Sequence, residues 1–297
     1  MHDVIIIGGS YSGMSAALTL GRARRSVLLI DANEPCNARV PHSHNLLTHD
    51  GEAPAELRAQ ARRDVARYST VRMLEGRAIE VSGSDGAFVV RTAEGGEHRS
   101  RKLLLALGVR DELPSIAGLA DCWGITAAAC PFCHGYEVSE RALVIIGSSP
   151  DNIQYAILLR NWSRNLRVFT NGASTFTDEQ RDMLQKHEVE VVEAPIAEVL
   201  HEKGRVKAVS LTDGGRIAVD ALFLRPRSVV PSAMLQSLGI TLTEQGLLQV
   251  DFVQRTNVAG VFASGDCTTP MRALSVAMAS GTMAGSAIVH ELVVPSH

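Results

Sequence analysis

Near its amino end the sequence reads Asp3-Val4-Ile5-Ile6-Ile7-Gly8-Gly9-Ser10-Tyr11-Ser12-Gly13. The apolar run at residues 4–7 is typical of a buried parallel strand. The small and apolar residues 14–20 predict a helix directly after the glycines, and residues 26–30 predict a second strand that ends at Asp31. Strand, glycine-rich turn, helix, strand and acid, in this order, are the fingerprint of a dinucleotide-binding fold.

The glycines of this stretch have separate physical tasks. Gly8 permits the tight turn after the strand, and Gly13 lets the helix pack closely against the strand. A pyrophosphate would then lie at the helix N-terminus, where free N–H groups and the helix dipole favour anions. Ser10 replaces the middle glycine of the fingerprint, and because serine is small, close approach of a phosphate is still expected.

A second informative stretch reads Cys130-Pro131-Phe132-Cys133-His134-Gly135-Tyr136-Glu137. Cysteines at C-x-x-C spacing can close a small disulfide, and the motif lowers the pKa of one thiol. On its own the stretch is compatible with a redox dithiol, half of a zinc site, or a coincidence. Zinc is disfavoured because the sequence has no second C-x-x-C, and His134 follows Cys133 too closely to complete a tetrahedron easily.

Composition excludes several classes of function. The 297 residues allow two domains, and the formal net charge of −3 with 4% aromatic residues argues against a nucleic-acid partner or an anionic membrane surface. No run is expected to reach the length of a membrane span, and the first apolar run is too short for a signal peptide. The five cysteines are an odd number and scattered, so they form no disulfide framework. A cytoplasmic protein is expected.

The carboxyl end adds a third motif. Residues 257–264 predict a short strand, Gly265-Asp266 follows it, and residues 272–292 predict a long helix rich in Ala, Ser, Gly and Met. Such a Gly-Asp can bring backbone and carboxylate against a polyol and a phosphate. Taken alone, Asp266 could equally be a helix cap.

Together, the two ends and the central dithiol resemble the low-molecular-weight thioredoxin reductase family of FAD disulfide oxidoreductases. The resemblance covers essentially the whole chain. It implies an α/β fold with two Rossmann-like, three-layer ββα nucleotide-binding domains, the second inserted into a discontinuous FAD domain. The FAD domain would comprise residues 1–115 and 230–297. Residues 116–229 would form the NAD(P)H-domain-like insert that carries the C-x-x-C, and a homodimer is expected.

The resemblance also implies which residues bind FAD. They come from the first turn and the acid after it, from the loop and strand ends beside it, and from the carboxyl-terminal motif with the start of its helix. These residues are Gly8, Gly9, Ser10, Tyr11, Ser12, Gly13, Asp31, Ala32, His44, Asn45, Ala78, Ala106, Gly108, Gly265, Asp266, Ala273, Leu274 and Ser275.

For the dithiol, the resemblance implies that Cys133 lies against the flavin and that substrate thiols attack Cys130. His134 would accept the thiol protons, unless it is a pocket histidine with only a structural hydrogen bond. Glu137 would either orient His134 or cap a turn. The reductases usually have an aspartate where this chain has His134. The histidine variant is similar to the dithiol oxidases that close disulfides in small natural products, such as the gliotoxin, holomycin and depsipeptide enzymes.

The expected NAD(P)H turn departs from the reductase pattern. Of the G-x-G-x-x-A positions only Gly147 is kept, and Ser149 and Asn152 stand at the other two. Pro150 removes a backbone donor and Asp151 would repel a phosphate. The strand at residues 166–170 is followed by neither paired arginines nor an acid. The NAD(P)H site is therefore expected to be decayed or remodelled.

Three functions are compatible with these patterns. The favoured one is FAD-dependent oxidation of a small dithiol to a disulfide, with oxygen as the final acceptor. The alternative is an NAD(P)H-dependent, thioredoxin-reductase-like reduction of a disulfide substrate. A flavin-binding regulator without turnover is the third, and the intact C-x-x-C argues against it.

Three further expectations concern segments outside these motifs. Cys36, Cys122 and Cys267 are expected to be ordinary core or loop residues. The histidine-rich residues 41–51 are expected to line a ligand pocket rather than hold a metal. Residues 53–68 are expected to form an exposed helix whose arginines face solvent.

Overall fold

The computed structural model describes residues 1–231 and 233–294, which form two compact units. Unit 1 comprises residues 1–38, 55–111 and the chain from residue 228 onward; unit 2 comprises residues 39–54 and 112–227. These crossings differ from the expected boundaries by a few residues, and residues 39–54 group with unit 2 rather than with the first domain. That the units serve as an FAD domain and an NAD(P)H-domain-like insert stays a prediction.

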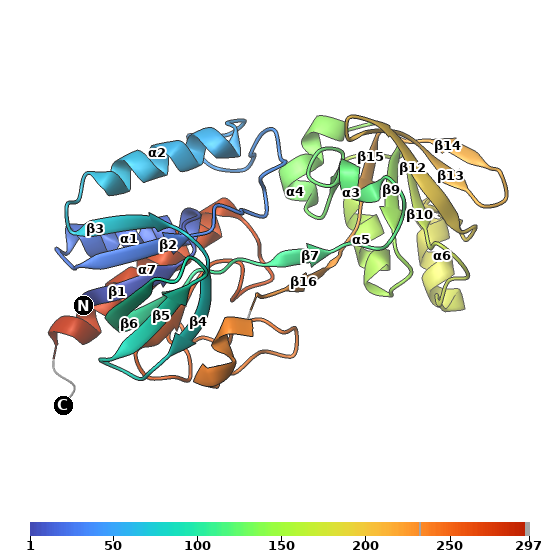
Figure 1. Ribbon diagram of the computed structural model, residues 1–297. Coiled ribbons are helices and arrows are strands. Elements are labelled where there is room, and N and C mark those ends of the chain that lie inside the picture. Colours follow the sequence, from blue (N-terminus) through green and yellow to red (C-terminus); the bar gives the residue numbers. More distant parts are fainter. Residues whose placement is uncertain (232, 295–297) are drawn as a thin grey trace. The chain divides into compact units, whose positions relative to one another are not determined.

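Unit 1 is built on a twisted sheet with the strand order β3-β2-β1-β6-β5-β4, and β17 also pairs with β6 (Figure 1). Strands β1, β2, β3, β6 and β17 are mutually parallel, whereas β4, β5 and the first half of β6 form an antiparallel meander. The elements are β1 His2–Ile7, α1 Tyr11–Arg22, β2 Val27–Asp31, α2 Pro54–Ala66, β3 Val71–Glu75, β4 Ala78–Ser82, β5 Phe88–Thr92, β6 Glu97–Leu105, η2 Ala233–Leu238, β17 Val261–Ala263 and α7 Leu274–Val293.

The side chains of β1 point alternately to the two faces of the sheet, and each face packs against a different layer of unit 1. Val4 and Ile6 point to one face, where they pack with Leu20 of α1 and Ile288 of α7. The neighbouring side chains point to the other face and enter a second core, formed with the β4–β5 hairpin, the η2 segment and the loop before β17. Both faces of the strand are fully buried, which is why its sequence is a continuous apolar run.

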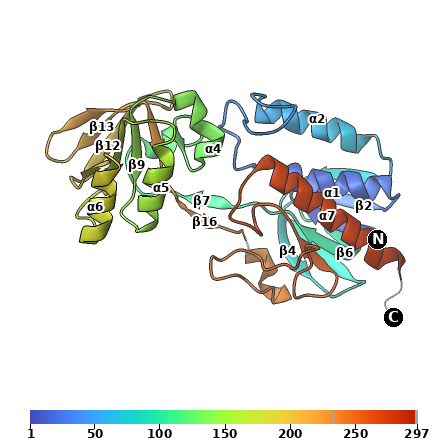
Figure 2. The same cartoon turned by 180° about the vertical axis from the view of Figure 1, so that it is seen from behind.

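Unit 2 repeats the same plan. Its parallel sheet has the order β11-β10-β9-β15-β8, and an antiparallel sheet β12-β13-β14 forms the second layer. The helices α5 and α6 pack on the parallel sheet (Figure 2). The elements are α3 Leu119–Cys122, β8 Ala127–Ala128, α4 Pro131–His134, η1 Tyr136–Val138, β9 Leu143–Ile146, α5 Asp151–Leu159, β10 Leu166–Phe169, α6 Asp178–Lys186, β11 Glu190–Val192, β12 Ile196–Glu202, β13 Arg205–Leu211, β14 Arg216–Ala218 and β15 Ala221–Phe223.

The strands β7 Arg110–Glu112 and β16 Arg227–Val229 pair in a separate two-stranded sheet. The chain passes from unit 1 to unit 2 within β7 and returns to unit 1 within β16. The remaining two crossings flank residues 39–54. This short segment therefore groups with residues 112–227, which come later in the chain, and not with the residues on either side of it. Its side-chain contacts, described below, explain the grouping.

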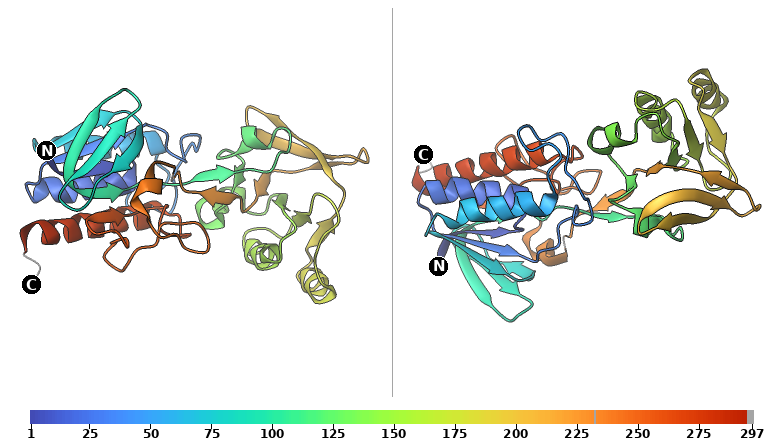
Figure 3. Two further views of the ribbon diagram at one scale, coloured as in Figure 1. Left: turned by 60° about the horizontal axis from the view of Figure 1, so that its bottom comes forward. Right: turned by 90° about the horizontal axis from the view of Figure 1, so that it is seen from above.

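Helix α7 corrects one expectation from the sequence. Its 20 residues are long and apolar enough to cross a membrane by length and composition, although no run of that length was expected. In unit 1 it lies along α1, as the views in Figures 2 and 3 both show. A Cβ added at Gly281 would come within 2.1 Å of the Ser12 carbonyl oxygen, so the two helices touch almost backbone to backbone. The core helix of a globular protein passes the same test of length and composition.

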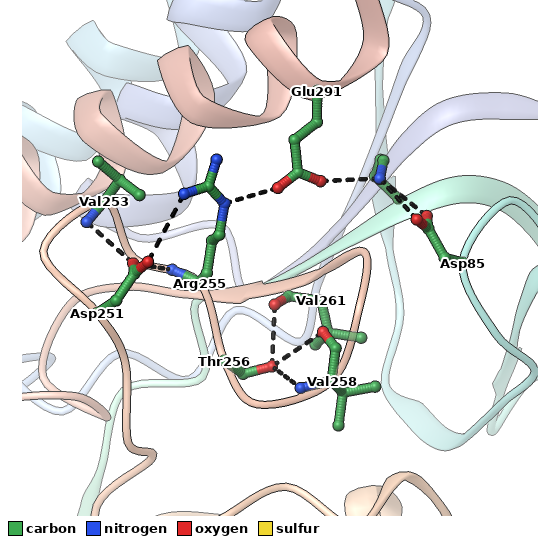
Figure 4. Close-up of polar contacts among 9 residues, drawn as sticks. Asp85, Asp251, Val253, Arg255, Thr256, Val258, Val261 and Glu291 are labelled. Carbon is green, nitrogen blue, oxygen red and sulfur yellow. Dashed lines mark hydrogen bonds and ion pairs between the residues drawn. The ribbon is translucent and has the colours of Figure 1, made fainter. Parts of the chain in front are cut away.

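The carboxyl end of α7 is held by a buried ionic network (Figure 4). The Lys102 ammonium is buried and lies 2.8 Å from a Glu291 oxygen and 2.9 Å from an Asp85 oxygen. Glu291 also accepts a 2.7 Å hydrogen bond from Nε of Arg255. Burial opposes the charge of Lys102, but the hydrogen bonds to Glu291 and Asp85 outweigh it and raise the pKa of Lys102. Glu291 is thus the shared partner of two cations.

The Glu291→Gln variant should lower the free energy of unfolding by about 1–3 kcal/mol, because it leaves buried Lys102 with one carboxylate. Urea denaturation followed by circular dichroism measures this. The matched control is Glu80→Gln, which removes an exposed ion pair with Arg91 and should cost at most about 1 kcal/mol. Equal effects of the two variants would show that the network adds nothing beyond an ordinary surface pair.

Candidate functional site

The first turn of unit 1 has no room for side chains at its glycines. Gly8 has φ +108°, and a Cβ there would lie 2.1 Å from the Ala106 carbonyl oxygen. A Cβ at Gly13 would lie 1.8 Å from the Gly8 carbonyl oxygen. Both positions therefore accept only glycine, as the sequence predicted, and the result is that α1 begins directly at the carboxyl edge of the sheet.

The start of α1 is suited to an anion. Ser10 is the N-cap residue in an extended conformation, its side chain makes no capping hydrogen bond, and the first helical turn contains no acidic residue. The first N–H groups of a helix and its dipole attract negative charge when no carboxylate already lies there. A pyrophosphate is therefore compatible with this helix end.

Asp31 lies at the same edge, at the end of β2. A Cβ on Gly9 would approach the Asp31 side chain to 2.6 Å, so the glycine backbone passes directly over this carboxylate. One Asp31 oxygen accepts a hydrogen bond from the Asn33 backbone at 3.1 Å, and the other lies 2.5 Å from Arg62 on α2. Arg62 is thus an exception to the expectation that the arginines of this helix only face solvent.

The carboxyl-terminal motif meets this turn. Ser264, at the end of β17, shares a 2.6 Å hydrogen bond between hydroxyl groups with Ser12 of α1, and both residues are buried. Gly265 has φ +83°, and its N–H donates to the Ser280 hydroxyl on α7 at 3.0 Å. The two motifs from opposite ends of the chain are therefore neighbours.

Asp266 is held by Arg272, a residue that the sequence analysis did not single out. Nε of Arg272 donates to Asp266 at 3.3 Å, while its two terminal nitrogens donate to both oxygens of Asp111 at 2.6 and 3.2 Å. Burial raises the pKa of the Asp266 carboxyl, and Arg272 partly opposes this effect. Asp266 is thus no helix cap but part of a polar cluster, with one carboxylate oxygen not used by Arg272.

The remaining predicted FAD residues fall into two groups. One group lies in unit 1, at the ends of β2 and β6, at the start of β4 and at the start of α7; it comprises Ala32, Ala78, Ala106, Gly108, Ala273, Leu274 and Ser275. The other group, His44 and Asn45, lies in unit 2. The role of every residue in both groups as an FAD ligand stays a prediction.

The residues of unit 1 fit an extended dinucleotide. Strands β1, β2, β6 and β17 are parallel, so their carboxyl ends meet at one edge, and α1 and α7 begin there. Gly8, Gly9 and Gly13 let the turn fold tightly, so that a phosphate can approach the backbone at the start of α1, and Asp31 and Asp266 offer carboxylates for hydroxyl groups. Ligands of open α/β sheets bind at this kind of edge.

The dithiol stretch lies in unit 2, where a disulfide joins Cys130 and Cys133 with 5.3 Å between their Cα atoms. Cys130 is the N-cap residue of α4, and Pro131 occupies the first helical position, for which its fixed φ is suited. A helix N-terminus stabilises a thiolate, and a nearby proton acceptor assists its formation. His134 is the last residue of the same helix.

Packing within unit 2 fixes this short helix. The hydroxyl group of Tyr155 donates to the Ala129 carbonyl oxygen at 2.9 Å, directly before Cys130. The Phe132 ring meets Trp162 edge to face at 5.4 Å between centroids. A Cβ on Gly135 would approach the Pro131 carbonyl oxygen to 2.5 Å and the Trp162 ring to 2.9 Å, so the turn after His134 requires a glycine.

His134 is partly buried, and its burial lowers the pKa of the imidazole, while Glu137 raises it and His44 lowers it. The imidazole is therefore neutral, and able to accept a proton, over a wider pH range than a free histidine. Glu137 forms its ion pair with His44, at 3.4 Å from Nε2. It acts on His134 through its charge, so the suggestion that it orients His134 remains a prediction.

The second glycine turn, after β9, differs from the first in its packing and charge. A Cβ at Gly147 would lie 2.3 Å from the Asn152 amide nitrogen, and Asn152 is buried. Asn152, at the third position of the fingerprint, thus packs its side chain against Gly147 where a small residue is usual. Pro150 is the N-cap of α5 and has no N–H to donate, and Asp151 places a negative charge in the first turn. The turn keeps the fold of a nucleotide site, but the start of its helix is less suited to a phosphate than the start of α1.

The end of β10 is also occupied by internal contacts. The Asn171 side chain accepts a 2.7 Å hydrogen bond from the Ile196 backbone, and the Thr170 hydroxyl donates to the Gly172 carbonyl oxygen at 2.6 Å. Dinucleotide sites place here an acid for ribose hydroxyls or a cation for a 2′-phosphate. These two side chains are already used in hydrogen bonds to β12 and to the turn itself.

The three other cysteines differ in exposure: Cys122 and Cys267 are buried, and Cys36 is exposed. Complete burial raises the pKa of Cys267 to about 12, so its thiol is inert. In the part of the chain that the structure describes, no group of three or more His, Cys, Asp or Glu side chains is placed to hold a metal ion.

A protein-family comparison covers both units. The model of the pyridine nucleotide-disulphide oxidoreductase family matches residues 2–281, nearly the whole chain. The chain belongs to this family. Members are flavin-dependent, and the chain is accordingly a thioredoxin reductase-like, flavin-dependent disulfide oxidoreductase, as the resemblance implied. Enzymes of this kind act on small disulfide or dithiol substrates.

Individual relatives cover the chain from end to end. A protein of Leptosphaeria maculans named thioredoxin reductase sirT is 32% identical over 97% of this chain and 93% of its own length. The crystal structure of an oxidoreductase from Agrobacterium tumefaciens is 39% identical and superposes with a TM-score of 0.94 over 99% of both chains. The crystal structure of a protein named HlmI is 35% identical, with a TM-score of 0.93 over 98% of this chain and 92% of that one. The predicted α/β class with Rossmann-like domains is confirmed.

The Gly9→Ala variant should bind FAD roughly tenfold more weakly, because the added methyl group displaces the Asp31 carboxylate and overpacking costs about 1–3 kcal/mol. Absorbance of the purified protein at flavin and protein wavelengths gives the occupancy. Gly76→Ala is the control, since its methyl group meets only the flexible Glu94 side chain, at 2.9 Å. Undiminished FAD content in Gly9→Ala would remove this turn from the binding site.

Proposed function

We propose that the protein oxidises a small dithiol to a disulfide through Cys130 and Cys133, with FAD as the internal electron acceptor and oxygen as the final one. The observation that carries this proposal is the combination of a complete dithiol centre in unit 2 with a second glycine turn whose helix begins at Pro150 and Asp151, a missing N–H donor and a negative charge. A reductase needs that turn in order to take electrons from NAD(P)H. An oxidase does not.

FAD would be held by the turn of residues 8–13, by Asp31 and by Asp266, and when bound it supplies a two-electron acceptor that oxygen can reoxidise. The glycine backbone and the α1 N-terminus would carry the pyrophosphate. The carboxylates of Asp31 and Asp266 would accept hydrogen bonds from ribose and ribityl hydroxyl groups. Arg62 and Arg272 keep these carboxylates in place.

The protein's own residues account for the thiol chemistry. A substrate thiolate attacks the Cys130 sulfur, which breaks the Cys130–Cys133 bond, forms a mixed disulfide and releases Cys133 as a thiolate. The second substrate thiol then attacks the substrate sulfur of the mixed disulfide, so that the product disulfide leaves and Cys130 is reduced. Each thiol that attacks must lose a proton, and His134 is the neutral acceptor beside the pair. Two electrons and two protons leave the substrate in total, and they convert one oxygen molecule to hydrogen peroxide.

The names of several relatives favour the opposite direction, since they are called thioredoxin reductase. In this chain, however, the helix after Gly147 begins with Pro150 and Asp151, and the Asn171 side chain after β10 is hydrogen-bonded to the start of β12. Oxidation of a dithiol requires FAD but no NAD(P)H, so it is consistent with both glycine turns. Reduction of a disulfide by NAD(P)H is consistent with the first turn only.

Purified enzyme supplied with reduced dithiothreitol and air, without NAD(P)H, should consume one oxygen molecule for each disulfide formed. Cys130→Ser should abolish this turnover, because the mixed disulfide cannot form. Cys122→Ser is the control: Cys122 lies in the same unit as the disulfide but is not part of it. Undiminished peroxide formation by Cys130→Ser, measured with an oxygen electrode and a peroxidase assay, would contradict the dithiol mechanism.

The pH dependence of this turnover should report His134. Because burial lowers the pKa of its imidazole, the neutral form persists below the usual histidine range, and the rate should fall only when the pH drops through that lowered value. His134→Gln should slow turnover by roughly 10²–10⁴-fold and remove this acid limb. His187→Gln, at the exposed end of α6, should retain both. An acid limb unchanged in His134→Gln would assign the proton to another group.

A further inference from the structure

Residues 39–54 belong to unit 2, although the chain on both sides of them belongs to unit 1. We call this segment the histidine loop. Arg39 fixes its start, because its guanidinium group donates to the carbonyl oxygens of Ala120 and Asp121 at 2.6 and 2.5 Å. The histidine loop is therefore anchored to the same body as the dithiol.

The histidine loop is also closed on itself. The Ser43 N–H donates to the Glu52 carbonyl oxygen at 2.7 Å, and the Gly51 N–H donates to the Ser43 carbonyl oxygen at 2.8 Å. The Asn45 N–H donates to an Asp50 side-chain oxygen at 2.6 Å. These bonds hold Asp50 in one position within the loop, so a side chain that pairs with Asp50 is also held.

His44 is that side chain. Its Nδ1 lies 3.6 Å from an Asp50 oxygen and its Nε2 lies 3.4 Å from a Glu137 oxygen, so the imidazole bridges two carboxylates. The His44 side chain is 22% exposed, whereas that of Glu137 is 40% exposed. Glu137 is three positions after His134, so His44 connects the histidine loop to the proton acceptor of the dithiol centre through a single carboxylate.

We propose that His44 is a positioning residue for thiol oxidation: bridged between Asp50 and Glu137, it holds the Glu137 carboxylate at the dithiol helix and sets the charge around His134. This goes beyond the sequence-based expectation that His44 contacts the cofactor. Only the expected effect on turnover rests on the proposed function. The contacts of His44 with Asp50 and Glu137 are present in unit 2 whatever reaction the protein catalyses.

The charges around His134 predict that loss of His44 and loss of Glu137 shift the pKa of His134 in opposite directions. Burial lowers its pKa most strongly, Glu137 raises the pKa, and His44 lowers it. Loss of Glu137 must therefore lower the pKa of His134 further. Loss of His44 must raise it, because the repulsion disappears and the Glu137 charge is no longer neutralised by its partner. Two residues that form one ion pair thus act in opposite directions on the same imidazole.

The test is an NMR titration of the histidine side chains in the oxidised full-length protein, with the His134 signal assigned by its absence in His134→Gln. His44→Gln should shift the His134 titration to higher pH, and Glu137→Gln should shift it to lower pH. His49→Gln is the matched control, because His49 pairs with Glu52 inside the same loop at 3.0 Å and makes no ion pair with the dithiol segment among the described residues. His49→Gln should leave the titration unchanged.

A double variant separates positioning from a merely structural effect. In a Glu137→Gln background, His44→Gln should shift the titration less than it does in the natural chain, because the part of its effect that passes through Glu137 is gone. In turnover with dithiothreitol and air, His44→Gln should lose on the order of tenfold at mildly acidic pH, where more His134 is protonated, and less at alkaline pH.

The outcomes are distinguishable from those of the proposed function. If no variant or natural enzyme oxidises dithiothreitol while the titration shifts as stated, the oxidase proposal fails and the positioning role of His44 stands. If the titration of His134 is unchanged in His44→Gln, or moves in the same direction as in Glu137→Gln, the positioning role is overturned whatever the turnover.

Discussion

The helices α1 and α7 come from opposite ends of the chain and touch almost without side chains between them. Gly281 lies against the Ser12 carbonyl oxygen, and Gly285 lies against Thr19 and the Ala16 carbonyl oxygen. A Cβ at Gly281 would come within 2.1 Å of the backbone, so any larger residue would force the helices apart. Because α1 follows β1 through one glycine motif and α7 follows β17 through the other, the close packing of the helices keeps the two motifs at one edge of the sheet. The proposed nucleotide site of unit 1 depends on this contact.

Unit 2 has the same layers as unit 1, but its glycine turn has a different composition. It has a parallel sheet, an antiparallel second layer and a turn with Gly147 after its central strand. Yet Asn152 packs its side chain against Gly147, and the next strand end is satisfied by Asn171 and Thr170. The fold is preserved because its strands remain fully buried, which is independent of whether the turn binds a phosphate. Unit 2 then supports the Cys130–Cys133 disulfide through Tyr155 and Trp162 instead.

Local patterns in the sequence were enough to predict β1, α1, β2, β10, β17 and α7, because these depend on continuous apolar runs and on glycines at fixed spacing. The short helix α4 and the antiparallel β12-β13-β14 sheet were not predicted. The disulfide was also predictable, since its partners are three residues apart. Arg62 and Arg272 were not, because each pairs with a carboxylate from a distant segment, 31 positions away for Asp31 and 161 for Asp111. No short sequence motif indicates that two residues so far apart in the chain form an ion pair. The grouping of residues 39–54 with unit 2 was missed for the same reason: it depends on Arg39 and on the contact between His44 and Glu137.

The direction of electron flow is the central claim, and it rests on Pro150 and Asp151 at the start of α5 rather than on the dithiol. Rapid mixing of the FAD-loaded enzyme under anaerobic conditions, with NADPH in one syringe and reduced dithiothreitol in a parallel experiment, tests it most directly. The account predicts that the dithiol bleaches the flavin absorbance band and that NADPH, supplied at the same concentration, leaves it intact. Bleaching by NADPH as fast as by the dithiol would contradict the account, because it would show that the turn after β9 still delivers electrons.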